Sequence, residues 1–271
     1  MDTLPENWFP EHVGGEIAPL AQALLYPYPA PAGDFYMRDG LPLEAPHGID
    51  PEALYGRVPV LSVGSNRAPL QLRRKFGAGA SLPVTSCQLI DADVVFAASL
   101  SFYCAIPATA CPSPGTVARL NITWLDQDQL DHMHDTEAVG IAYDYVQIDA
   151  GVVDHGQRPA DAVFDQPVFG YQARAGVLAR DGSPVAQRGI AATGRRFAEA
   201  DQAEMLTWAR KVADADISTT QTSLEGWITS LRSSRPSRDH VIAALAGHAH
   251  LPEQQPWQVV DAVSRNPDAF L

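Results

Sequence analysis

The middle of the chain alternates between short apolar runs of strand length and two helical runs. Residues 58–63 are nearly all apolar and have the length of a buried strand. Residues 69–76 follow as an expected helix that begins at Pro69, because a proline in the first turn removes no needed hydrogen bond. The core side chains expected on this helix are Leu70, Leu72 and Phe76. The pattern therefore predicts a strand, a short turn and a helix.

The segments after this helix favour further strands. Residues 84–90 and 94–98 are rich in strand-forming side chains, with a turn-like stretch over 91–93 between them. Residues 116–125 alternate imperfectly between apolar and polar side chains. The remaining predicted elements are a helix capped by Asp126 and ending at Thr136, and strands over 143–149 and 168–178. Antiparallel neighbours joined by short turns favour a curled or closed sheet over a doubly wound one.

The two ends of the chain differ from its middle. Residues 1–57 are rich in proline, which excludes a long helix or a central strand, yet their aromatic side chains are too apolar for a solvated tail. We expect an arm that packs on the domain, with a helix over residues 17–25. Residues 197–271 predict a helical extension, with helices over 199–213, 223–231, 238–246 and 257–264. The predicted fold class is α+β, with a small mixed or closed sheet over residues 58–196 and flanking helices.

Composition narrows the classes of partner. The 271 residues carry a formal net charge of −13, which argues against a nucleic-acid partner because phosphate binding needs a basic face. The one dense basic run, residues 73–75, is expected to be a solvated helix face. No positively charged leader precedes an apolar run, and no apolar stretch reaches the length of a membrane span, so we expect no signal peptide and no membrane partner.

Cysteine usage favours a reducing compartment. The three cysteines are too few and too irregularly spaced for a disulfide framework, so they are expected to be buried thiols of a cytoplasmic protein: Cys87, Cys104 and Cys111. Pairing of Cys104 with Cys111 under oxidation is the alternative.

The turn between the first strand and its helix carries candidate binding chemistry. Its residues are Gly64, Ser65 and Asn66. Glycine permits a positive φ and a close approach of a ligand, and Asn66 is a candidate helix N-cap. Backbone N–H groups at such a turn, together with the helix dipole, favour an anion. The alternative is an ordinary capped turn without a ligand.

Two segments together resemble the gamma-glutamylcyclotransferase-like family. The family carries a Tyr-Gly-Ser-Asn loop, followed about seventy residues later by an Asp-x-x-Glu-Gly-like segment. Gly64, Ser65 and Asn66 match the loop, and Glu137 matches the glutamate, with Asp135 and Thr136 before it. Residues 114–117 also look like the family's Pro-Gly hairpin. The resemblance covers roughly residues 58–195, about half of the chain. This chain has Val63 where the family has Tyr, and alanines at 118 and 138 where glycine is usual.

The resemblance implies an intramolecular reaction that needs no cofactor. The α-amine of a γ-glutamyl group attacks its own γ-carbonyl, which releases an amine and forms 5-oxoproline. Glu137 would be the general acid and base. The turn, with its preceding residue Val63, would anchor the small-molecule substrate through the backbone of Gly64, Ser65 and Asn66. Tyr143 is a candidate for orienting the substrate, with Tyr145 as a second choice.

Competing interpretations follow from the same residues. Taken alone, Glu137 is a solvent-facing glutamate at a helix end, and Tyr143 an ordinary core or rim aromatic. His132 and His134 suggest a metal site, but residues two apart on a helix point to different faces, so we expect no metal and a surface helix. No nucleophile elbow or phosphate loop is present. The alternative functions are a non-catalytic small-molecule-binding or interaction module on the same fold, and an assembly role in which the arm and the C-terminal helices form a homo-oligomer.

Overall fold

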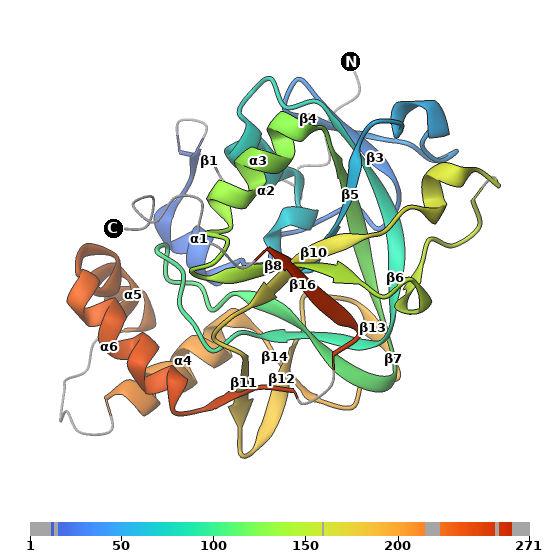
Figure 1. The fold of residues 1–271 in the computed structure, drawn as a ribbon. Helices are drawn as coiled ribbons and strands as arrows, with labels where there is room; N and C mark the ends of the chain where they lie inside the picture. Colours follow the sequence, from blue (N-terminus) through green and yellow to red (C-terminus); the bar gives the residue numbers. More distant parts are fainter. Residues whose placement is uncertain (1–11, 14–15, 159, 215–222, 253–254, 262–271) are drawn as a thin grey trace.

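The computed structural model describes residues 12–13, 16–158, 160–214, 223–252 and 255–261. Within them the chain forms six α-helices and a mixed sheet of fourteen strands, which confirms the α+β class (Figure 1). The expectation of a small sheet is wrong, because strands from both ends of the chain join the central ones. The helices are α1 (Pro19–Leu24), α2 (Pro69–Phe76), α3 (Gln127–Thr136), α4 (Gln202–Ala213), α5 (Leu224–Ser233) and α6 (Arg235–Ala246).

The main path of the sheet runs through nine strands. Their order is β15 (Ala249–His250), β11 (Val177–Arg180), β12 (Ser183–Gln187), β6 (Leu82–Phe96), β7 (Ala108–Leu125), β5 (Val58–Ser62), β10 (Phe169–Ala173), β8 (Tyr143–Ile148) and β16 (Trp257–Asp261). β5 pairs antiparallel with β7 and parallel with β10, which makes the sheet mixed. Strands β3 (Phe35–Arg38), β4 (Leu41–Glu44), β9 (Val153–Asp154), β13 (Ala192–Thr193) and β14 (Ala198–Ala200) pair off this path, and β1 (His12–Val13) pairs with β2 (Glu16–Ile17) in a separate sheet.

β6 and β7 are longer than the sequence pattern predicts. The two strands expected over 84–90 and 94–98 form one strand, and the turn-like stretch between them is an irregularity at Asp91, whose φ is +56°. The expected Pro-Gly hairpin at 114–117 is wrong. Ala92 of β6 pairs with both Pro112 and Val117 of β7, so the residues between these two bulge out without reversing the chain. The Asp91 carboxylate accepts a hydrogen bond from the Gly115 N–H at 2.7 Å and holds this bulge.

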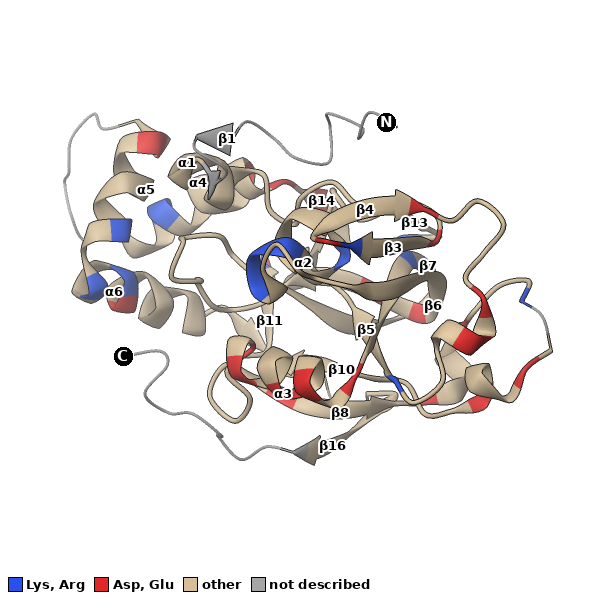
Figure 2. Cartoon of the chain, turned by 90° about the horizontal axis from the view of Figure 1, so that it is seen from above, with Lys and Arg blue, Asp and Glu red and all other residues tan. Residues whose placement is uncertain are grey.

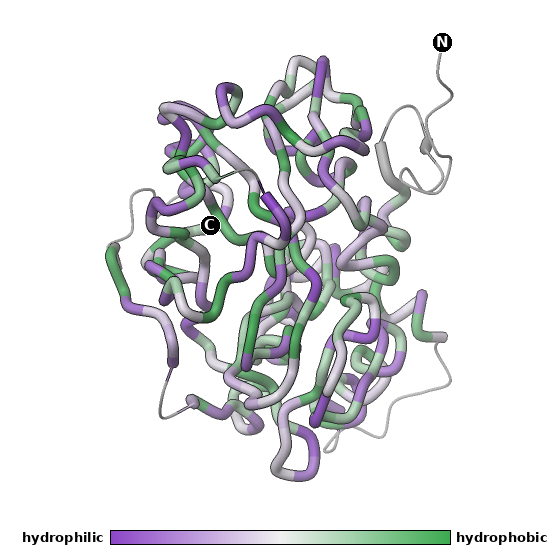
Figure 3. The backbone as a smooth tube through the Cα atoms, turned by 90° about the vertical axis from the view of Figure 1, so that its right-hand side faces the viewer, coloured by the Kyte–Doolittle hydropathy of each residue, from purple (hydrophilic) through white to green (hydrophobic). Residues whose placement is uncertain are grey.

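The helices cover different parts of the sheet. α2 and α3 lie together, and their apolar side chains Leu72, Leu130 and Met133 pack with strand residues such as Val60 and Val84. α4, α5 and α6 gather at the opposite end, beside β11 and β12 (Figure 1). Hydrophobic and hydrophilic stretches are interleaved along the whole backbone (Figure 3). No helix in the described ranges combines the length and the apolar character that a bilayer crossing requires.

The terminal segments extend the sheet. The helix expected over 17–25 is present as α1, and β3 of the same arm pairs with β6. Three of the four helices expected after residue 197 are present as α4, α5 and α6. The helix expected over 257–264 is wrong, because β16 pairs with β8 over residues 257–261; residues 262–264 lie outside the described part. Two adjacent β-branched residues, Val259 and Val260, favour this strand once β8 offers a partner edge.

Candidate functional site

The turn after β5 depends on a close approach to the N-terminal arm. A Cβ atom on Gly64 would lie 2.3 Å from the Tyr26 hydroxyl oxygen and 3.2 Å from the Ala108 Cβ. Its φ is −124°, so the turn does not use the positive φ that glycine permits, and close packing is what requires glycine here. Tyr26 is fixed in turn, because its hydroxyl accepts a hydrogen bond from the Ala108 N–H at 2.8 Å. Val63, which precedes the turn, packs partly buried against the main core.

Asn66 does not cap α2. Residues 65–67 form a 3₁₀ turn, and the helix N-cap is Ala68, which makes no side-chain cap hydrogen bond. The expectation of an Asn66 cap is therefore wrong, while Pro69 does open the helix. The Asn66 side-chain amide instead donates to a Glu137 carboxylate oxygen at 3.0 Å. This contact joins two segments that are 71 residues apart.

The turn contains backbone N–H groups that have no hydrogen-bond acceptor among the described residues. In the described part of the chain, no acceptor is bonded to the N–H groups of Gly64, Ser65 and Asn66. The carbonyls of Gly64 and Ser65 accept from Arg67 and Ala68, which closes the 3₁₀ turn. Three consecutive N–H groups therefore remain available for an external acceptor.

Glu137 lies at the C-terminal end of α3 and faces the turn. The side chain is 15% exposed, so the solvent-facing alternative is wrong. Its N–H donates to the Met133 carbonyl at 2.9 Å, which holds the last turn of α3. At the other end of α3 the Asp126 cap is present as expected, with Gln129 completing a capping box. Capping at one end and the turn contact at the other fix where the Glu137 carboxylate lies.

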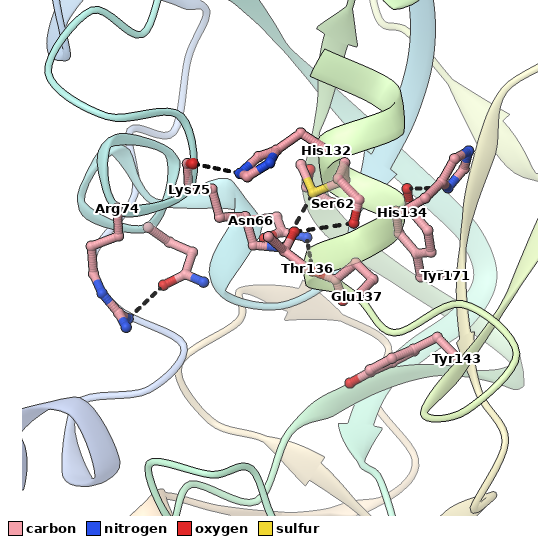
Figure 4. Close-up of polar contacts among 12 residues, drawn as sticks. Ser62, Asn66, Arg74, Lys75, His132, His134, Thr136, Glu137, Tyr143 and Tyr171 are labelled. Atoms are coloured by element: carbon pink, nitrogen blue, oxygen red, sulfur yellow. Dashed lines mark hydrogen bonds and ion pairs between the residues drawn. The ribbon is translucent and has the colours of Figure 1, made fainter. Parts of the chain in front are cut away.

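Lys75 is a charged residue of the candidate site that the sequence analysis missed. Its ammonium forms an ion pair with the Glu137 carboxylate and lies 3.2 Å from the Met133 sulfur (Figure 4). The Lys75 side chain is 6% exposed, so the expectation of a solvated face for residues 73–75 is wrong at this position. The cause is packing, because the basic last turn of α2 lies beside the acidic helix α3 (Figure 2). Arg74 is exposed, as expected for this run.

The backbone turns sharply just after Glu137. Ala138 has a φ of +54°, a left-handed conformation that favours glycine. Its N–H donates to the Asp135 carbonyl at 3.2 Å, and the Val139 N–H donates to the His134 carbonyl at 3.2 Å. These bonds end α3 and turn the chain toward β8. The residue after Glu137 therefore occupies a position where glycine is the natural choice.

Three phenols lie close enough to the Glu137 carboxylate for its charge to raise their pKa values: Tyr26, Tyr103 and Tyr143. Tyr143 begins β8, and its hydroxyl donates to the Ala108 carbonyl at 3.5 Å; Tyr145, the second choice, stacks on Phe169 elsewhere in the core. Burial, followed by the Glu137 charge, raises the pKa of Tyr143 well above its usual value and that of Tyr103 to about 12. Burial also raises the pKa of Tyr26. All three phenols are therefore neutral hydrogen-bond donors near neutral pH. Only Tyr143 stands out in the sequence, through its place on the strand after Glu137.

The two histidines of α3 have structural partners. The His132 ring nitrogen Nε2 lies 2.7 Å from the Lys75 carbonyl oxygen, which ties α3 to α2. His134 is buried, contrary to the surface-helix expectation, and its Nδ1 lies 3.0 Å from the Tyr171 hydroxyl oxygen. No group of three or more potential metal ligands occurs among the described residues. The three cysteines are free and buried.

A surface hollow lies elsewhere on the molecule. It has a volume of about 430 Å³ and lies along α4, lined by residues that include Arg180, Glu204 and Trp208. None of its lining residues belongs to the cluster around Glu137. Searches against protein-family models, curated proteins and solved structures find no match to this chain.

Proposed function

We propose that the protein is a cyclotransferase-type enzyme with the gamma-glutamylcyclotransferase-like fold, which cleaves a γ-glutamyl or similar aminoacyl amide. The observation that carries the proposal is the 3.0 Å hydrogen bond between Asn66 and Glu137. It brings the glycine-containing turn and the acidic residue into one site, although they come from distant segments. The largely buried Glu137 carboxylate supplies a base. The N–H groups of the turn supply hydrogen-bond donors to an anion, and the neutral phenols supply further donors.

The proposed reaction is an internal acyl transfer. Glu137 takes a proton from the substrate α-ammonium, and the free amine attacks the γ-carbonyl carbon. A new C–N bond closes the five-membered ring as the amide C–N bond breaks. The ring nitrogen gives up a second proton as that bond breaks, and both protons pass through Glu137 to the leaving nitrogen, so the products are neutral-amide 5-oxoproline and the leaving amine as its ammonium form. Nucleophile and electrophile belong to one molecule, so the protein needs mainly to fold the substrate and move the proton.

Lys75 has a defined part in this proposal. The substrate ammonium and the Lys75 ammonium compete for the same carboxylate, because Glu137 is paired with Lys75 in the free protein. When the substrate ammonium takes that place, Lys75 pairs with the substrate carboxylate or with the oxyanion that forms on the γ-carbonyl. The N–H groups of Gly64, Ser65 and Asn66 supply further donors to the same negative charge.

The test is release of 5-oxoproline from a panel of γ-glutamyl amines. The wild-type chain is expected to turn over at least one of them, and Glu137→Gln to lose about 10²-fold or more in rate, as is typical when a general base is removed. Glu44→Gln is the matched control, since it makes the same change at an exposed glutamate. Equal turnover by the wild type and Glu137→Gln removes Glu137 from the mechanism.

The ion pair also supports a second candidate, a non-catalytic binding module on the same fold. A carboxylate already neutralised by Lys75 is suited to holding a zwitterionic small molecule by exchange of partners. This candidate predicts no turnover across the panel, together with a ligand-dependent rise in Tm that Glu137→Gln abolishes. With either function we propose a cytoplasmic location, because free thiols are typical of proteins in a reducing compartment.

A further inference from the structure

Arg67 is a buried cation with few partners. It is the last residue of the 3₁₀ turn and is 9% exposed. Its Nε donates to the Asn121 Oδ1 at 3.0 Å, which is the one hydrogen bond of its side chain among the described residues. No carboxylate in those residues forms an ion pair with it. A buried guanidinium normally has a charged partner, because burying an unpaired charge is costly.

Asn121 adds a second buried donor beside it. It lies in the middle of β7, paired with Ser62 of β5 and Ser86 of β6, and is 1% exposed. Its Oδ1 accepts from Arg67, and the Nδ2 of the same amide group is buried without a hydrogen-bond partner. Among the described residues, the two side chains therefore carry N–H donors and a positive charge that no acceptor satisfies in full.

The nearest titratable groups do not supply the missing charge. Burial raises the pKa of the Cys87 thiol to about 12, so the thiol is neutral near neutral pH. Burial lowers the pKa of Arg67 to about 10, which leaves the guanidinium protonated. The Asp34 carboxylate, whose charge acts on the Cys87 thiol, is paired with Arg158 and accepts from the Ser86 N–H at 2.8 Å. Asp34 is thus already paired with another arginine.

We propose that Arg67 and Asn121 form a binding site for a carboxylate group, separate from Glu137. A carboxylate accepts two parallel hydrogen bonds from a guanidinium edge, and the Asn121 Nδ2 supplies a third. The two sites are separate because the consecutive turn residues have different partners: Asn66 donates to Glu137, and Arg67 donates to Asn121. The low exposure of both donors limits the ligand to a small carboxylate or to the carboxylate end of a larger molecule. The proposal is independent of the cyclotransferase reaction.

The first test is thermal unfolding of the full chain as sodium acetate replaces sodium chloride at constant ionic strength. At about ten times its Kd, acetate is expected to raise Tm by about 3 °C. Benzoate is the second probe: a response to acetate alone assigns a free small anion, and a response to both assigns the end of a larger molecule. Equal Tm values in chloride, acetate and benzoate overturn the proposal.

Two variants separate the site from a general salt effect. Asn121→Asp places a carboxylate beside Arg67 with almost no change of shape, so it is expected to raise Tm in chloride and to remove the acetate response. Arg188→Gln, a change at an exposed arginine, keeps the wild-type response. An acetate response that persists in Asn121→Asp overturns the proposal. If that variant does not fold, Arg67→Lys replaces it, and a response of wild-type size in Arg67→Lys then overturns the proposal, because the two-pronged contact is lost.

Glu137→Gln keeps these results distinct from those on turnover. It is expected to retain the acetate response of the wild type, because its side chain reaches neither Arg67 nor Asn121. Loss of turnover with retained acetate binding supports two separate sites. Loss of the acetate response in Glu137→Gln contradicts the separation and overturns this proposal, whatever the turnover assay shows.

Discussion

Replacing Lys75 with Met tests the ion pair at the centre of the site. The change keeps the length of the side chain and removes its charge, which leaves the Glu137 carboxylate 15% exposed and without its cation. Breaking a buried ion pair typically costs 3–5 kcal/mol. Asn66 still donates to the carboxylate and some solvent reaches it, so we expect about 2–3 kcal/mol here. For a chain of this size that is a fall in Tm of roughly 4–6 °C.

A double-mutant cycle with Glu137→Gln isolates the pairwise energy. The single change Glu137→Gln leaves the Lys75 ammonium, which is 6% exposed, without a counterion, so its cost is expected to be about 3–4 kcal/mol. The double variant removes both charges and is expected to cost less than the sum of the two single variants by at least about 1.5 kcal/mol. Urea unfolding, followed by circular dichroism, measures all four proteins.

Lys211 provides the matched control for the lysine change. It is the only other lysine of the chain, and like Lys75 it lies in the last turn of a helix, but it is exposed. Lys211→Met is expected to change the free energy of unfolding by less than about 0.5 kcal/mol. If Lys75→Met costs no more than this control and the cycle is additive, the buried ion pair is not present in solution.

Three further predictions concern the backbone and pH. Gly64→Ala brings a Cβ against the Tyr26 hydroxyl and is expected to cost about 1–3 kcal/mol in thermal unfolding, with part of the loss restored by Tyr26→Phe. Ala138→Gly relieves a left-handed φ and is expected to stabilise by about 0.5–1 kcal/mol; a loss of stability contradicts the positive φ. Burial, with the Arg158 charge, lowers the pKa of His155 below 6.5, so the unfolded chain binds a proton more readily and stability is lost as pH falls below 6.5. Urea unfolding at several pH values should show a smaller loss for His155→Gln.

The sequence predicts the elements whose signals are local. The helix over 69–76 has the predicted bounds, and α3 begins at its predicted cap, Asp126. In both cases the residues that decide the boundary lie within one turn of it. β16 shows the opposite case, because the choice between strand and helix for residues 257–261 depends on the free edge of β8, more than a hundred residues away. A pattern read along the chain carries no information about that edge.

The candidate site divides in the same way. Gly64 and Glu137 are visible in the sequence because each follows a recognisable local pattern. Lys75 and Arg67 are not, because a basic residue near a helix start or end is usually exposed, and only tertiary packing decides otherwise. Tyr26 belongs to the proline-rich arm, and the sequence of the arm does not reveal which part of the domain it packs against. What the sequence misses is therefore which charged and aromatic side chains the fold buries.

The segment from β5 to α2 accounts for both polar sites through one piece of backbone. Gly64 packs against Tyr26, and this contact fixes the start of the 3₁₀ turn. From that fixed start, Asn66 reaches Glu137 and Arg67 reaches Asn121, while the helix that follows brings Lys75 back to Glu137. A shift of the backbone in Gly64→Ala therefore displaces the donors of both sites together, whereas Lys75→Met changes only the Glu137 site. A comparison of these two variants in the acetate titration distinguishes a shared support from two unrelated clusters.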